Sequence, residues 1–271
     1  MAGFCILNGE IEKISTLKTA PIFVLNDAEK EDIRLYDTKP LCMGLHFQNL
    51  IARLQQKNVA IPEKFTKERI DRYVSRLLNV NKVFRGGVCT LLVFWQQFPE
   101  ATQPQFCIFI EPLDRAKFTF NEVGLKLGFK EIYSERQPYI PVSIFSANEE
   151  YALNVDALCR IDRLGHSYTT DKGDLLLIKD TVIHVCENML PFTTYFTEYL
   201  SRNKKWTIVK HLRFVGKDIY DSSEVLLCSS FVGLQWVSHV YSPMSVTDAH
   251  VYGFRYAKEL FFEMERAIEQ M

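Results

Sequence analysis

The feature that constrains the fold most is a change of hydrophobic period along the first hundred residues. Short apolar segments rich in β-branched and aromatic residues come first, namely FCILNG, PIFVL and DIRLYD, and turn-forming residues separate them. From residue 46 apolar side chains recur three and four residues apart, in HFQNLIARLQQKN and TKERIDRYVSRLLNVN. Two long strand-like segments, GGVCTLLVFWQQ and QFCIFIEPL, follow. The sequence therefore predicts strands of one antiparallel sheet with two amphipathic helices inserted between them.

A second set of elements follows a segment without clear period. The residues PLDRAKFTFNE contain a proline and several charges, which is typical of a link between domains. We expect an N-terminal lobe over 1–114, a linker near 115–122 and a C-terminal lobe over 123–271. The second lobe is predicted to be rich in strands, with a helix at TTYFTEYLSR and a long final helix over 247–271. The predicted class is α+β in two lobes.

Composition excludes several kinds of partner. The 271 residues include 32 basic and 33 acidic ones, so the formal charge of -1 provides no global field for nucleic acid or an anionic membrane. No apolar run approaches the length of a membrane span, and the first residues lack the basic region of a signal peptide. The seven cysteines are odd in number, scattered and mostly inside apolar runs, which favours reduced thiols. These features predict a soluble, cytoplasmic protein.

Motifs for common active sites are missing from the sequence. The six histidines never recur at the spacing that brings two imidazoles to one metal ion, so no metal site is expected. The two glycines of FRGGVC precede a strand rather than a helix, which favours a tight turn over a phosphate loop. No GxSxG motif is present, and CSSF at 228–231 is predicted to end a strand. The polar segment 162–174 is interpreted as a loop between two strands.

The order of the segments resembles the class IV aminotransferases. These enzymes have pyridoxal-phosphate fold type IV and include branched-chain and D-amino-acid aminotransferases and aminodeoxychorismate lyase. FCILNGEI resembles the opening strand of the family, and GHSYTTDKGDLLLIKD matches without a gap the stretch from a turn glycine through TEGSSSN into IFFVKDG. NMLPFTTYFTEYL resembles ILPGITR and its helix, while DIYDSSEVLLCSSFVGLQWV resembles LYLADEVFMSGTAAEITPV. The resemblance implies a D-amino-acid aminotransferase-like fold with a smaller N-terminal lobe and a larger, β-rich C-terminal lobe.

The residues that carry chemistry in that family are replaced here. Phe145 falls on the lysine that forms the Schiff base with the cofactor, and a phenyl ring cannot form one. Thr169 falls on the glutamate that pairs with the pyridine nitrogen, and Asn49 falls on the phosphate-binding arginine of H..RL. Phe192 replaces the glycine of PGIT and would crowd the amides offered to phosphate. The chain is also about eight residues shorter than the family pattern between Phe145 and Thr169.

Other positions of the matching pocket keep their hydrogen-bonding capacity. We expect the cleft between the lobes to be lined by Asn49, Phe145, Thr169, Thr193, Thr194, Ser229 and Ser230, of which the two serines match the SGT phosphate contact. The alternative for each is an ordinary structural role, as a core aromatic or a cap of a turn.

These departures lead to a hypothesis about function. The chain is predicted to be a pseudoenzyme that does not use pyridoxal phosphate and acts by binding a ligand or partner. The alternative is a divergent pyridoxal-phosphate-dependent aminotransferase or aminodeoxychorismate lyase whose active residues are misaligned. The resemblance also implies a homodimer.

Overall fold

The computed structural model describes residues 3–17, 27–95, 103–113, 117–131, 155–162, 164–242 and 245–271. The chain divides into two compact units, Met1–Lys117 and Phe118–Met271. The large buried clusters lie within one unit or the other, so each unit has a hydrophobic core of its own.

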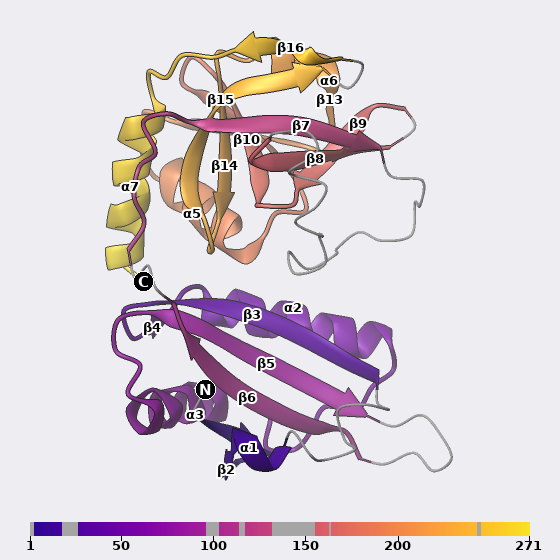
Figure 1. The fold of residues 1–271 in the computed structure, drawn as a ribbon, viewed down its shortest axis with the longest axis vertical. Helices are drawn as coiled ribbons and strands as arrows, with labels where there is room; N and C mark the ends of the chain where they lie inside the picture. The colour runs from indigo at the N-terminus through magenta and orange to yellow at the C-terminus, as the bar shows by residue number, and fades with distance from the viewer. Residues whose placement is uncertain are drawn as a thin grey trace. The chain divides into compact units, whose positions relative to one another are not determined.

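The first unit contains a six-stranded sheet in the order β2-β1-β6-β5-β3-β4 (Figure 1). Every pairing in it is antiparallel, which confirms the sheet predicted from FCILNG, DIRLYD and the two later strand-like segments. The predicted strand PIFVL (21–25) lies outside the described residues. The turn before β5 explains the two glycines of FRGGVC. Gly86 has φ 107°, and a Cβ on Gly87 would lie 2.5 Å from the carbonyl oxygen of Glu111. The strands are β1 (Phe4–Leu7), β2 (Glu10–Lys13), β3 (Asp27–Tyr36), β4 (Lys39–Pro40), β5 (Gly87–Trp95) and β6 (Gln105–Pro112).

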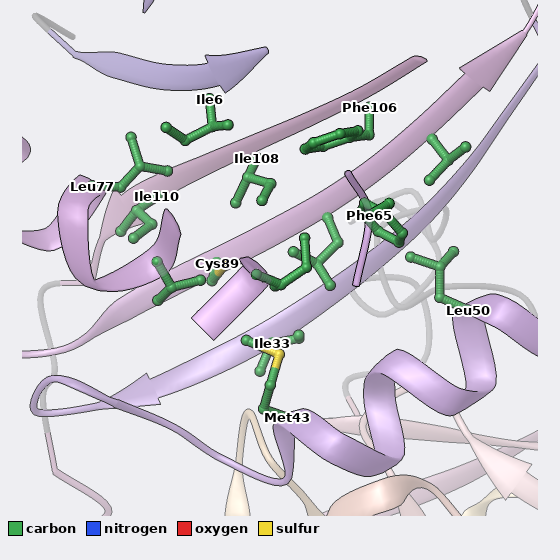
Figure 2. Close-up of a cluster of buried hydrophobic side chains, with 14 of the residues drawn as sticks. Ile6, Ile33, Met43, Leu50, Phe65, Leu77, Cys89, Phe106, Ile108 and Ile110 are labelled. Carbon is green, nitrogen blue, oxygen red and sulfur yellow. The ribbon is translucent and has the colours of Figure 1, made fainter. Parts of the chain in front are cut away.

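Two amphipathic helices pack against this sheet, α2 (Met43–Gln56) beside β3 and α3 (Lys67–Asn81) beside β1 and β6. The short helix α1 (Ile14–Leu17) follows β2. The apolar stripes of α2 and α3 are buried as the period predicted, and Figure 2 shows Met43, Leu50 and Leu77 directed toward the sheet. The strands supply the other side of this core: Ile6, Ile33, Cys89, Phe106, Ile108 and Ile110.

The second unit contains a ten-stranded mixed sheet (Figure 1). Its order is β12-β11-β10-β14-β15-β7-β8-β9-β13, with β16 paired to β15. The pairs β11 with β12, β15 with β7 and β7 with β8 are parallel. The strands are β7 (Leu125–Glu131), β8 (Ala157–Ile161), β9 (His166–Thr170), β10 (Asp174–Lys179), β11 (Val182–Cys186), β12 (Thr207–His211), β13 (Phe214–Val215), β14 (Glu224–Ser229), β15 (Gly233–Ser242) and β16 (Ser245–Val251).

Helices α5 (Pro191–Ser201) and α7 (Ala257–Glu269) contact each other and pack on β14 and β15 respectively, while α6 (Gly216–Tyr220) follows β13. The buried carboxylate of Glu224 caps α7, because its two oxygens accept hydrogen bonds from the amides of Tyr256 at 2.8 Å and Ala257 at 3.0 Å.

Two secondary-structure predictions were wrong. The final helix does not begin at residue 247, because residues 245–251 pair with β15 as an antiparallel strand and the helix begins only at Ala257. The polar segment 162–174 is not all loop, since β9 occupies 166–170 and pairs with β8 and β13. In both cases a neighbouring strand decided the conformation, which periodicity along one segment does not reveal.

Candidate ligand site in the second unit

Three connecting segments of the second unit meet around the first turn of α5. They are the β9–β10 turn, the segment between β11 and α5, and the end of β14. Asp174 Oδ2 accepts a hydrogen bond from the amide of Leu190 at 2.7 Å, and Thr193 Oγ1 donates to the carbonyl oxygen of Cys228 at 3.0 Å. Ser229 Oγ donates to the carbonyl oxygen of Lys172 at 2.8 Å. Together with the Thr169 contacts to Gly173 O and Asp174, these bonds place Thr169, Thr193 and Ser229, which the family resemblance predicts to line one pocket, in one part of the unit.

Thr169 lies near the end of β9, and its side chain turns back on the β9–β10 turn. Its hydroxyl lies 3.1 Å from the carbonyl oxygen of Gly173 and 3.4 Å from Asp174 Oδ1. A threonine hydroxyl has one proton to donate, and the shorter of these contacts is to a backbone carbonyl. Thr169 therefore closes the turn, which is the ordinary structural role predicted as its alternative.

Asp174 is a buried acidic residue at the start of β10, and no sequence motif had pointed to it. The residue is 4% exposed, and burial raises the pKa of its carboxyl to about 6. Hydrogen bonds from Thr193, the amide of Leu190 and Thr169 act in the opposite direction. The Thr193 hydroxyl lies beside two acceptors, Cys228 O and Asp174, and its one proton satisfies one of them at a time.

A signal for Asp174 was present in the sequence. In the gapless match to TEGSSSN, Asp174 falls on the final asparagine, so a neutral amide is replaced by a carboxylate at the start of a buried strand. Acidic residues are rarely buried unless they are paired. That change could have indicated a perturbed carboxyl group, although it was not used as a prediction.

The remaining predicted residues have different surroundings. Thr194 is half-buried in α5, and Ser230 is buried directly after β14. Phe192 lies in the interior, 1% exposed, with its ring centroid 6.3 Å from that of Phe118. It has the role of a core aromatic. Phe145 lies outside the described residues.

Asn49 lies on the exposed side of α2 in the first unit. Arg53 follows one helical turn later, but its guanidinium already binds two carboxylates. Arg53 Nε lies 2.8 Å from Glu29 Oε2, and Arg53 Nη2 lies 2.5 Å from Glu31 Oε2. The arginine that follows Asn49 on this helix is thus committed to structural ion pairs.

Metal ligands and membrane spans were sought in the part of the chain that the structure describes. No group of three or more histidine, cysteine, aspartate or glutamate side chains there is arranged to hold a metal ion. None of the helices described is both long and apolar enough to cross a membrane.

Comparisons with known proteins identify the fold. No family model and no curated protein sequence matches the chain. Solved structures do match. A Thermobaculum terrenum branched-chain amino acid aminotransferase in its PLP-form superposes with a TM-score of 0.76 at 11% identity, covering 100% of this chain and 95% of that chain.

Two further structures agree with this result. The Escherichia coli branched-chain amino acid aminotransferase gives a TM-score of 0.72 at 13% identity, with 96% and 92% of the two chains covered. A putative 4-amino-4-deoxychorismate lyase from Legionella pneumophila gives 0.72 at 13% identity, with 91% and 93% covered. The chain therefore has the α+β fold of the class IV aminotransferases, as the order of its segments indicated. Identity this low establishes the fold and leaves the activity open.

Proposed function

We propose that this chain is a class IV aminotransferase-like pseudoenzyme that does not use pyridoxal phosphate and acts by binding a ligand or partner. The observation that carries the proposal is the use of the hydroxyl protons at the pocket positions. Thr169, Thr193 and Ser229 each have a backbone carbonyl acceptor at 3.1 Å or less. A hydroxyl supplies one proton, so donation to a dianionic phosphate requires breaking these bonds.

The charge of the region supports the same proposal. The carboxylate of Asp174 lies buried among these hydroxyls, where it opposes the approach of a second anion. In the family resemblance Asn49 takes the place of the phosphate-binding arginine. Arg53, one turn later, is already bound by two carboxylates. This donor set does not fit a dianionic phosphate, and a neutral or cationic ligand suits it better.

Two losses concern the chemistry of the cofactor rather than its binding. Pyridoxal phosphate reacts through a Schiff base with a lysine and acts as an electron sink when its ring nitrogen is held protonated. Phe145 supplies no amine, and the Thr169 hydroxyl supplies no carboxylate. The proposal therefore assigns no transamination or lyase activity to the chain.

The test is spectroscopic. The purified protein, mixed with excess pyridoxal phosphate and then freed of unbound cofactor by gel filtration, is expected to be colourless. Treatment with borohydride is expected to leave its intact mass unchanged. A yellow protein that borohydride bleaches, with a gain in mass of one reduced cofactor, would favour the alternative: a divergent pyridoxal-phosphate enzyme with other active residues.

The proposal extends to assembly and compartment. We propose a homodimer, as the family resemblance implies, and a reducing cytoplasmic environment. Six of the seven cysteines are buried and Cys42 is half-buried, which suits a reducing compartment. Light scattering at micromolar concentration tests the dimer.

A further inference from the structure

Helix α3 presents a row of arginines to solvent. Arg69, Arg72 and Arg76 are exposed, and their spacing of three and four residues places them on one face, opposite the buried Ile70 and Val74. None of the three forms a salt bridge with a described residue. Within α3, the ion pair that the described residues make is Lys67 with Asp71, at 3.7 Å. We call Arg69, Arg72 and Arg76 the arginine row.

The arginine row concentrates positive charge on one face of α3, although Glu68 lies one turn before Arg72 and interacts with it electrostatically. Like charges three or four residues apart repel each other, and positive charge near the N-terminus of a helix opposes the helix dipole. Val80, one turn after Arg76, is 39% exposed and extends the row with an apolar side chain. A row of exposed arginines without a salt bridge to any residue that the structure describes is a candidate for a binding surface that carries negative charge.

Helix α7 carries the complementary pattern. Phe262 is 49% exposed, and Glu265 and Glu269 follow it at spacings of three and four residues. The other glutamates of α7 are paired, Glu259 with Lys205 and Glu263 with Arg266. Glu265 and Glu269 have no such salt bridge to any residue that the structure describes. We call Phe262, Glu265 and Glu269 the acidic row.

We infer that the arginine row of one copy of this chain binds the acidic row of a second copy. In an antiparallel arrangement Arg76 faces Glu265 and Arg72 faces Glu269, because each pair is separated by four residues, or about 6 Å along the helix axis. Val80 then lies next to Phe262 and gives the contact an apolar end. In a two-fold dimer the contact forms twice, which doubles a modest interaction.

This inference rests on the proposed homodimer and names its surface, whereas it is independent of cofactor loss. Arginine and glutamate form bidentate, charge-assisted hydrogen bonds across interfaces. A contact of this kind weakens with added salt, because screening acts on exposed charges. The dimer is therefore expected to dissociate more readily at high ionic strength.

The decisive experiment reverses the charges. One variant carries Arg72→Glu with Arg76→Glu, and the other carries Glu265→Arg with Glu269→Arg. Sedimentation velocity at micromolar concentration is expected to show that each variant alone has lost at least about tenfold in dimer affinity. An equimolar mixture of the two variants is expected to recover it, because every contact in the mixed dimer again joins opposite charges. A chain with all four substitutions is expected to dimerise as the parent does.

The matched control for the Arg72→Glu, Arg76→Glu variant is Lys204→Glu with Lys210→Glu. It makes the same change in net charge at exposed lysines of the second unit and is expected to leave the dimer intact. Alanine at Arg72 and Arg76 provides a milder variant, and circular dichroism checks that each protein is folded. A monomeric parent contradicts both the dimer and this inference. A parent dimer that the reversals leave unchanged contradicts the inference alone, as does a mixture that fails to recover, because α3 and α7 then do not meet across the interface.

Discussion

At the scale of single residues, the buried carboxyl of Asp174 links the pocket to the stability of the second unit. Burial raises the pKa of this group to about 6. The folded state therefore binds its proton more tightly than the unfolded state does. The stability gained from that proton is fully present below about pH 4 and is lost as the pH rises through about 6. At neutral pH the charged carboxylate costs free energy.

Replacing Asp174 by asparagine is expected to stabilise the protein at neutral pH. The amide oxygen can still accept from the Leu190 amide, and the amide nitrogen can donate to the Thr169 hydroxyl oxygen. The expected gain in the free energy of unfolding is on the order of 1 to 3 kcal/mol at about pH 8, and it disappears near pH 4. Urea unfolding at the two pH values measures it.

Asp221→Asn is the matched control, since Asp221 is exposed at the end of α6 and is expected to change stability little at either pH. If Asp174→Asn instead lowers stability at high pH, the hydrogen bonds that the Asp174 carboxylate accepts stabilise the protein more than burial of its charge destabilises it.

A pair of histidines gives the second unit an opposite dependence on pH. His184 Nδ1 lies 2.8 Å from His211 Nε2 between the parallel strands β11 and β12. Burial, together with electrostatic interactions with His211 and with the positive charge of Lys179, lowers the pKa of His184. Its contribution to stability is present above the pKa of an unfolded histidine and is lost as the pH falls through the lowered value.

His184→Gln is therefore expected to reduce the loss of stability between about pH 7.5 and about pH 5. Because Asp174 titrates equally in the parent and the variant, comparing the two isolates the histidine. The urea midpoint at each pH is the measurement. An equal loss in both proteins would show that the pair does not contribute to acid sensitivity.

At the scale of secondary-structure elements, close backbone contact between the β9–β10 turn and β14 shapes the candidate site. A Cβ on Gly173 would lie 2.6 Å from the carbonyl oxygen of Cys228 and 3.0 Å from the Cβ of Ser229. Strand β10 pairs with β14 in the same region, with Asp174 opposite Cys228. Only glycine allows the turn to approach this strand end so closely.

Gly173→Ala is expected to destabilise the protein by about 1 to 3 kcal/mol, because the turn must move away from β14 and the Ser229 bond to Lys172 O is strained. Gly253→Ala is the control, since a Cβ there meets no atom within 4 Å. Thermal unfolding compares the two. Equal melting temperatures would contradict the close contact.

At the scale of the whole molecule, the resemblance assigns cofactor-binding roles to residues of both units, Asn49 in the first and Thr169 in the second. Restoring cofactor binding should then require changes in more than one unit. Phe145→Lys alone is expected to leave the protein colourless with pyridoxal phosphate, because the phosphate still lacks a cation and the ring nitrogen lacks a carboxylate. Two missing charge-assisted hydrogen bonds weaken binding on the order of a hundredfold or more.

Adding Asn49→Arg and Thr169→Glu to Phe145→Lys is expected to produce measurable aldimine absorbance, which absorption spectra before and after borohydride record. A triple variant as colourless as the parent would mean that other features close the site. A strongly yellow single variant would contradict the account of the phosphate and nitrogen contacts.

Much of the architecture followed from the sequence. Periodicity located α2 and α3, and alternation located the long strands of the first unit, because each pattern reports which side of one element is buried. The order of segments indicated the fold, since loop and strand lengths persist when side chains change. The resemblance also predicts that Phe145, Thr169 and Asn49 stand in place of the family's chemical groups, because side-chain type alone decides whether a Schiff base or an ion pair is possible.

Tertiary structure decided what the remaining polar groups do. Residues 245–251 form a strand because β15 supplies the partner, although the apolar period predicted a helix from residue 247 onward. The hydroxyls of Thr193 and Ser229 donate to carbonyl groups 35 and 57 residues away in sequence. The charge of Asp174 matters because the fold removes it from water. Hydrogen-bond partners and burial depend on segments distant along the chain, so local sequence specifies the donors while the fold selects their acceptors.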